Sequence, residues 1–228
     1  MSIWPEIAPA VWLTLRLAGV TTVILVGLAL PLAWWLATTR SVVLKPIVEA
    51  ITTLPLVLPP TVLGFYLLVL LSPETTLGGF WLDLTGSTLT FSFTGLVIAS
   101  CLYSLPFAVQ PMQTAFVSLG RGAMEAARTL GASRRDAFRT IALPLAKRGV
   151  LTASVLTFAH TMGEFGVVLM VGGNIPGQTR VIAIEIFTSV ETLDYDTAHI
   201  LSAGLLAFSF LVLLVVYTLN GRGARTLG

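Results

Sequence analysis

Five long apolar segments constrain this chain more than any other feature of its sequence. A helix needs about 20 mostly apolar residues to cross the hydrocarbon core of a bilayer. Segments of that length run from about Val11 to Ala37, Ile47 to Leu71, Phe93 to Phe116, Val150 to Val171 and His199 to Leu219. Only 11% of the residues are charged, against about 25% in a soluble domain. The sequence therefore predicts an all-α integral membrane protein, with residues 1–228 forming one transmembrane domain of five helices.

The charged residues are divided unequally between the two ends of these segments. Eleven of the thirteen Lys and Arg lie on one side of an alternating five-span layout: Arg40, Lys45, Arg121, Arg128, Arg134, Arg135, Arg139, Lys147, Arg148, Arg222 and Arg225. The opposite side carries mostly acids and a single cation, Arg180. Because loops rich in Lys and Arg stay in the cytoplasm, we expect the C-terminus inside and the N-terminus outside. The first residues lack the basic stretch of a cleaved signal peptide, so we expect the first span to be retained.

The basic loop, residues about 118–147, is predicted to form two short helices around a glycine. Ala123–Leu130 contains strong helix formers, and Gly131 follows as a C-terminal cap that tolerates the left-handed conformation. Ser133 is placed to cap a second helix, with Asp136 at the capping-box spacing. Pro144 is expected to end that helix before the fourth span.

The same loop resembles the conserved loop of ABC importer permeases. The matching residues are Glu125, Ala126, Ala127, Gly131, Ile141, Leu143 and Pro144. The resemblance implies the type I ABC importer transmembrane-domain fold. It also implies that the loop is a coupling element, which docks in a groove of a separate nucleotide-binding ATPase subunit. The alternative is an ordinary basic loop held near anionic lipid.

A second resemblance covers most of the chain and concerns the cargo. Leu54–Pro60, Gly163–Gly166 and Gly173–Arg180 are similar to segments of molybdate permeases. Permeases for sulfate and tungstate share parts of these patterns, so both remain alternatives. The family often carries arginine where this chain has His160.

Glu164 is the one acidic residue well inside a predicted span, with His160 one helical turn earlier. A charge at the bilayer centre costs about 2.5–3.5 kcal/mol on insertion scales, so this side chain should face protein or water. We expect a gate or a pathway face here, or else a structural hydrogen bond between spans. Direct binding of an anion by a carboxylate is electrostatically unfavourable. The candidate pathway or gate residues are Glu164, His160, Gly163, Gly166, Pro59 and Pro60.

Prolines are expected to shape two of the spans. Pro55, Pro59 and Pro60 remove backbone donors from the second span and should kink or break it. Pro106 and Pro111 are expected to do the same to the third span.

The loop after the fourth span carries the candidate contacts with an outer partner, Asn174 and Arg180. It is predicted to form a turn at Gly173–Gly177 and a short helix over Arg180–Glu191. Arg180 is a candidate for steering an oxyanion, and its alternative role is an ion pair with Glu185 or Asp194.

Enzymatic functions find no support in the sequence. It contains no phosphate-binding Gly-rich loop with its Lys and Ser or Thr, no residues at metal-ligand spacing, and no nucleophile with a base. We therefore expect no cofactor on this chain, with ATP and magnesium bound by the partner ATPase.

The resemblance implies an assembly in the bacterial inner membrane. Two copies of the chain would pair with two ATPase subunits and a periplasmic oxyanion-binding protein, and none of these partners is a nucleic acid. An ion-driven secondary transporter and a membrane scaffold without transport activity are the remaining alternatives. The first would require internal repeats and buried ionisable pairs, and the second would not require the docking loop.

Overall fold

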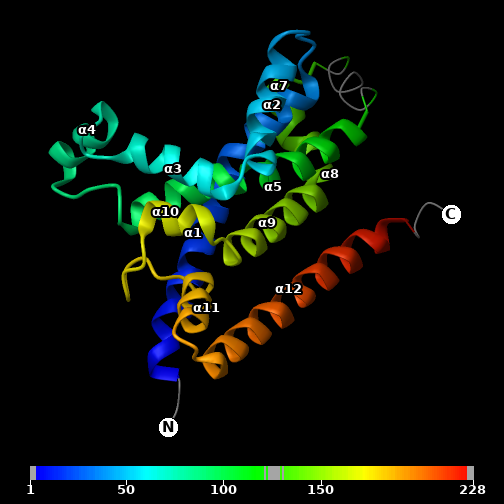
Figure 1. Cartoon of the computed structure of the whole chain (residues 1–228). Coiled ribbons are helices and arrows are strands. Elements are labelled where there is room, and N and C mark those ends of the chain that lie inside the picture. The colour runs from blue at the N-terminus through cyan, green and yellow to red at the C-terminus, as the bar shows by residue number, and fades with distance from the viewer. Residues whose placement is uncertain (1–3, 121, 123–128, 130, 225–228) are drawn as a thin grey trace.

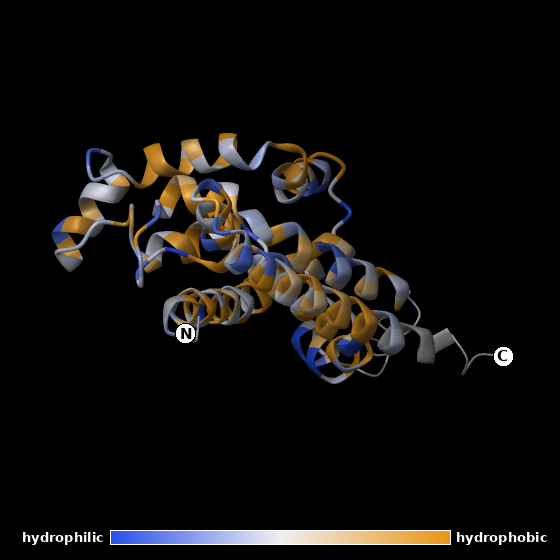
Figure 2. Ribbon diagram, turned by 60° about the horizontal axis from the view of Figure 1, so that its bottom comes forward, coloured by the Kyte–Doolittle hydropathy of each residue, from blue (hydrophilic) through white to orange (hydrophobic). Residues whose placement is uncertain are grey.

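The computed structural model describes residues 4–120, 122, 129 and 131–224, and the regular elements in these residues are helices. In chain order they are α1 (Trp4–Thr38), α2 (Leu44–Val57), α3 (Pro60–Leu71), α4 (Thr76–Thr85), α5 (Phe93–Ser118), α7 (Arg134–Ala137), the π-helix η1 (Phe138–Ala142), α8 (Leu143–Leu145), α9 (Lys147–Met162), α10 (Gly166–Gly172), α11 (Ile182–Glu191) and α12 (Tyr195–Ala224). Figure 2 shows hydrophobic residues along the helices and hydrophilic residues mainly at their ends and connections.

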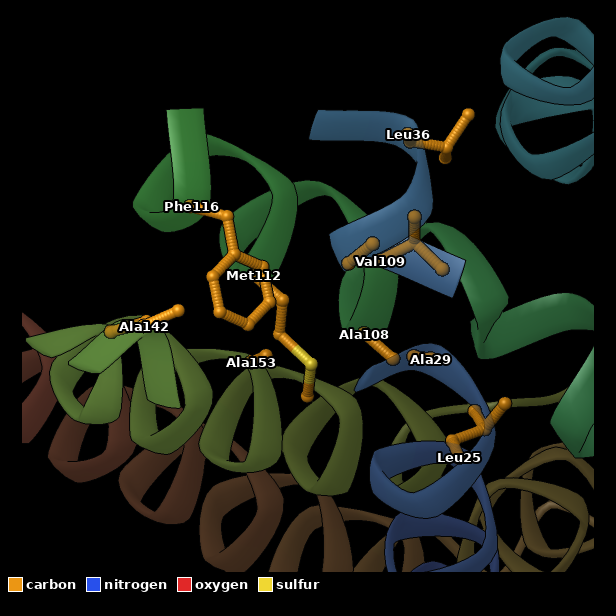
Figure 3. Close-up of a cluster of buried hydrophobic side chains, with 11 residues drawn as sticks. Leu25, Ala29, Leu36, Ala108, Val109, Met112, Phe116, Ala142 and Ala153 are labelled. Atoms are coloured by element: carbon orange, nitrogen blue, oxygen red, sulfur yellow. The ribbon is translucent and has the colours of Figure 1, made fainter. Parts of the chain in front are cut away.

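Helices α1, α5 and α9 pack together and form the centre of the molecule. Their shared core contains small and large apolar side chains, including Ala29, Ala108, Met112 and Ala153, each 0% exposed (Figure 3). Half of the apolar window of α5 is buried, against 11% for α12. Helix α12 touches α11 and α9 and then runs clear of the rest of the chain (Figure 1), so most of its apolar surface is left for lipid or for another protein chain.

Three helices are long and apolar enough to cross a bilayer alone, and they cover Ile7–Thr38, Phe93–Ser118 and Tyr195–Thr218. Two bent helix pairs bring the number to as many as five if each pair is one span. These pairs are Leu44–Val57 with Pro60–Leu71, bent by 112°, and Arg135–Leu145 with Lys147–Met162, bent by 69°. The five-span layout stays a prediction, since length and composition alone do not place a helix in the membrane.

The break expected in the second apolar segment is present between α2 and α3. Leu58 and Pro59 have extended backbone, with ψ of 137° and 133°. This conformation is what a following proline favours, and Pro59 and Pro60 offer no N–H to continue the ladder. The third segment was also expected to kink or break at its prolines, and the expectation of a break is wrong. α5 runs unbroken through Pro106 and Pro111, because close packing against α1 and α9 holds the helix together around the missing bonds.

Helix α4 was not expected from the sequence, which predicted only a loop rich in Gly, Thr and Ser between residues 72 and 92. Its first turn is capped by Thr75, whose hydroxyl accepts a hydrogen bond from the N–H of Gly78 at 3.1 Å. Gly86 ends the helix in the left-handed conformation, with φ of 70°. A threonine N-cap and a glycine C-cap are common at helix ends. They were not recognised in the sequence because the helix between them is short.

The start of α9 approaches the end of α5 so closely that only glycine fits at position 149. A Cβ added to Gly149 would overlap the Cβ of Ala115 and lie 3.1 Å from the carbonyl oxygen of Pro111. We therefore predict that Gly149→Ala destabilises the protein by about 1–3 kcal/mol through overpacking, seen as a lower Tm in detergent. Gly27→Ala is the control, because a Cβ there meets nothing within 4 Å. Ala115→Gly should restore the stability of Gly149→Ala, and a Tm unaffected by Gly149→Ala would contradict this packing.

Candidate functional site

Glu164 lies in a break between two helices, not inside one. α9 ends at Met162 and α10 begins at Gly166. In between, the N–H groups of Gly163 and Glu164 donate to carbonyl oxygens of the last turn of α9, at 3.0 and 3.4 Å. The fourth predicted span is therefore interrupted at Glu164, although the side chains of His160 and Glu164 still lie on the same side, 3.4 Å apart. The chain leaves the helix at Gly163, and the Glu164 side chain contacts α5.

The Glu164 carboxylate is buried, with the residue 2% exposed, and two serines of α5 hold it. The hydroxyls of Ser100 and Ser104 donate to its two oxygens, each at 2.5 Å. Nδ1 of His160 lies 3.4 Å from the same carboxylate and 2.8 Å from the Ser104 oxygen. The Thr161 hydroxyl lies 2.9 Å from that oxygen. These five residues form what we call the polar cluster, which links α5 to the end of α9.

One assignment of protons uses every hydrogen-bonding position of the Ser104 hydroxyl. Ser104 has one O–H and two acceptor positions. If it donates to Glu164, its oxygen accepts from the Thr161 hydroxyl and from an N–H at Nδ1 of His160. This arrangement fixes the orientation of the His160 ring. The ring is also stacked on Phe107, with centroids 4.0 Å apart, and tilted against Tyr103 at 4.9 Å.

A hollow of about 550 Å³ opens beside the polar cluster. It is lined by Pro60, Thr61, Tyr103, Ala159, His160, Gly163, Glu164, Phe165 and Gly166. The two helix breaks meet here, because a Cβ added at Gly166 would lie 2.9 Å from the Cβ of Pro60. Irregular backbone at membrane depth is tolerated only inside protein or around a water-filled space. The broken ends of both helix pairs therefore line one hollow in the described part of the chain.

The structure brings together most of the residues predicted for the pathway. Pro60, His160, Gly163, Glu164 and Gly166 line the hollow, while Pro59 precedes it in the break and is exposed. Sequence reasoning missed Ser100 and Ser104. Their spacing of four residues on an apolar helix is a usable signal only once their acidic partner is known.

The outer loop holds its arginine in a local network. The Arg180 guanidinium donates to the Asn174 side chain at 2.5 Å and lies 3.4 Å from the Glu185 carboxylate. Asn174 in turn donates to the hydroxyl of Thr188 at 3.0 Å. The expected pairing of Arg180 with Glu185 is confirmed. The network fixes the turn onto α11, and an oxyanion-steering role stays a prediction.

The predicted coupling segment, which is the basic loop of residues about 118–147, is only partly described. Glu125, Ala126 and Ala127 lie outside the described residues. Gly131 has φ of 83°, the left-handed conformation expected of it. The Ser133 hydroxyl accepts from the backbone N–H of Asp136 at 3.2 Å, as expected for a helix cap, and donates to the Asp136 carboxylate.

The second half of the coupling segment ends close to the place predicted from Pro144. Its helix continues to Leu145, one residue past that proline, and a bend of 69° separates it from Lys147–Met162. Pro144 itself lies in the short element α8, and α9 begins at Lys147. Ile141 and Leu143 are half-buried, while Pro144 and Leu145 are exposed.

Metal and cofactor chemistry has no visible support in the described part of the chain. No group of three or more His, Cys, Asp or Glu side chains lies close enough to hold a metal ion there. The hollow is lined by no Lys or Arg among the described residues.

Comparison with known proteins gives one family and several relatives. Residues 29–225 match the family described as binding-protein-dependent transport system inner membrane component. The molybdenum transport system permease protein ModB of Azotobacter vinelandii is 54% identical over 209 residues, covering 92% of each chain. The sulfate transport system permease protein CysT of Salmonella typhimurium is 36% identical over 61% of this chain and 51% of its own length.

Solved structures agree on the fold. A chain of the inward-facing MetNI methionine ABC transporter superposes with a TM-score of 0.64 at 21% identity, covering 99% of this chain and 97% of its own. A chain of a bacterial alginate ABC transporter, solved with an alginate-bound periplasmic protein, gives a TM-score of 0.73 at 18% identity, covering 94% and 78%. At these identities the likeness shows the fold alone.

The polar cluster predicts unequal roles for its two serines. Ser104 contacts three side chains, whereas Ser100 contacts Glu164. Leaving a buried polar group without its partner costs about 1–3 kcal/mol. We therefore expect Ser104→Ala to lower the Tm in detergent more than Ser100→Ala. Ser154→Ala is the control, because that hydroxyl donates only to a carbonyl of its own helix. Equal effects of Ser104→Ala and Ser154→Ala would contradict the network.

Proposed function

Because the chain belongs to the family of binding-protein-dependent transport system inner membrane components, we propose that it is the permease that translocates molybdate or a similar tetrahedral oxyanion. The chain is a multi-pass inner membrane permease and not the ATPase of its importer. The observation that supports molybdate as the substrate is the identity of 54% with a molybdenum permease across 92% of both chains. Sulfate is the second candidate, because a sulfate permease is 36% identical over a shorter range.

Two copies of the chain would form the membrane part of the importer, with two ATPase subunits inside and a periplasmic binding protein outside. The excess of Lys and Arg at one end of the helices supports this orientation, with the N-terminus outside and the C-terminus in the cytoplasm. A symmetric pair places equivalent surfaces around a two-fold axis. The uncovered apolar surface of α12 is available for lipid and for the second copy.

Transport would follow from closure of the ATPase subunits. ATP binding would draw the two coupling segments together and open the spans outward, and hydrolysis would reset them. The oxyanion would then cross a water-filled path beside the hollow. The hollow presents a buried carboxylate and no cation among its described lining residues. We therefore assign selectivity chiefly to the binding protein and not to this permease.

The polar cluster supports a gate at the break between α9 and α10. His160, Gly163, Glu164 and Gly166 surround this break, and Pro59 and Pro60 form the neighbouring break before α3. A helix that is already interrupted has backbone torsions free to change. Glu164, clamped by two serines, would set the position of the broken ends relative to α5.

The proposed function predicts ATP-driven oxyanion uptake by the reconstituted complex. We would reconstitute the permease with its ATPase subunit and binding protein in liposomes, and measure molybdate uptake with sulfate as competitor. We expect uptake that needs ATP, the binding protein and the ATPase subunit, and that excess sulfate reduces little. Uptake without the ATPase subunit would favour a secondary transporter. Strong inhibition of molybdate uptake by sulfate would favour sulfate as the substrate.

The gate predicts a transport defect in Glu164→Gln that leaves assembly intact. Glutamine keeps the shape of the side chain but removes a charge that two hydroxyls stabilise. Hydrogen bonds to charged groups are the stronger ones, so we expect uptake to fall by roughly tenfold with normal recovery of the complex. Asp83→Asn is the control, since Asp83 is exposed and lies outside the polar cluster. Unchanged uptake by Glu164→Gln would leave Glu164 with a packing role only.

A further inference from the structure

Three aromatic rings join the coupling segment to the two central helices. Trp34 lies near the end of α1, Phe116 near the end of α5, and Phe138 is the first residue of η1. The Trp34 ring lies 5.2 Å from the Phe116 ring and 5.2 Å from the Phe138 ring, measured between centroids. Phe116 and Phe138 are 6.0 Å apart. Each ring therefore contacts both others, and we call this group the aromatic joint.

The coupling segment has a buried side that faces the aromatic joint and an exposed side that faces solvent. Its inner side is made of small side chains, with Ala137 and Ala142 both 0% exposed. Figure 3 shows Phe116 and Met112 of α5 lying over the helices that carry Ala142 and Ala153. The outer side carries Arg139 and Leu145, both exposed. The outer side is thus free for a partner, while the inner side is held by the central helices.

A displacement of the coupling segment can be followed along two routes through the described residues, one along the chain and one across space. The route along the chain passes through the bend of 69° before α9. Because the helix is not straight there, it transmits a displacement into α9 poorly. The route across space passes through the rings of Trp34 and Phe116 into α1 and α5. Close-packed interiors transmit displacement because they have no free volume to absorb it. Rings on two torsions are stiffer than flexible aliphatic chains, so this second route is the rigid one.

The π-helical turn adds a local reason for movement at this place. η1 covers Phe138–Ala142, so the backbone turn that carries Phe138 is wider than an α-helical turn. π-helical turns are rare and occur frequently at functional sites. A return to α-helical pairing would rotate the side chains that follow relative to those that precede.

We propose that the aromatic joint transmits the displacement of the coupling segment to α1 and α5, with Phe138 as a positioning residue for transport. The inference rests on the proposed ATP-driven import. If the aromatic joint has this role, its loss causes a specific defect: the complex still hydrolyses ATP, but less substrate is transported for each ATP hydrolysed. A joint that only stabilises the fold predicts a loss of complex, with uptake and hydrolysis falling together.

The test measures ATP hydrolysis and molybdate uptake by the reconstituted complex in the same liposomes. We expect Phe138→Ala to raise the ATP hydrolysed per molybdate imported by roughly threefold to tenfold, with smaller change in Phe138→Leu. Trp34→Leu should give a similar rise, and the double variant little more than either alone, because both act through one contact. Phe208→Ala is the control, since it removes a ring pair with Phe158 at 6.1 Å, away from the joint.

The outcomes separate this inference from the proposed function. If the unmodified complex imports no molybdate with ATP, the proposed function fails and the joint has nothing to couple. If the unmodified complex imports molybdate and Phe138→Ala keeps the same ratio of ATP to molybdate, the joint is not the route. Equal rises in Phe138→Ala and Phe208→Ala, or additive rises in the double variant, would also overturn it.

Discussion

The absence of water in the hydrocarbon core is the constraint on which the rest of this structure depends. Each backbone N–H and C=O at that depth must find a partner within the protein. The described chain meets this demand with helices, and its long apolar segments form them. Interruptions are therefore costly. The two main ones, before Pro60 and around Glu164, lie against each other and share one hollow.

The polar cluster shows how a charged group is accommodated in such surroundings. The Glu164 carboxylate has lost water but gained two hydroxyl donors and a neighbouring imidazole. Both oxygens of this carboxylate therefore have a hydroxyl donor from α5. This arrangement ties the broken end of α9 to α5 without filling the hollow. A carboxylate held in this way is suited to positioning helices and poorly suited to binding an anion.

Under the proposed function, the coupling segment would have a different task, which is to pass a displacement from a soluble partner to the buried helices. Its outer side keeps Arg139 and Leu145 exposed, and its inner side packs alanines and Phe138 against Trp34 and Phe116. Glycine at position 149 then lets α9 lie directly on α5. The segment and the central helices are thus in close contact through Trp34, Phe116 and Phe138, and such contact is the condition for movement in one to reach the other.

The sequence by itself determined the helical membrane class, the family and the left-handed turn at Gly131, because apolar length, residue spacing and glycine geometry are local properties. It also located the break before α3, since prolines act on their own backbone. Tertiary structure decided that Pro106 and Pro111 leave α5 unbroken, that Glu164 sits in a turn, and that Ser100 and Ser104 hold it. The short α4 was missed for a local reason, since its two caps lie in a segment rich in Gly, Thr and Ser that resembles a loop. The unbroken α5 and the serines that hold Glu164 depend on contacts between segments far apart in the chain, such as Ser104 and Glu164 at a separation of 60 positions, and packing there outweighs local preference.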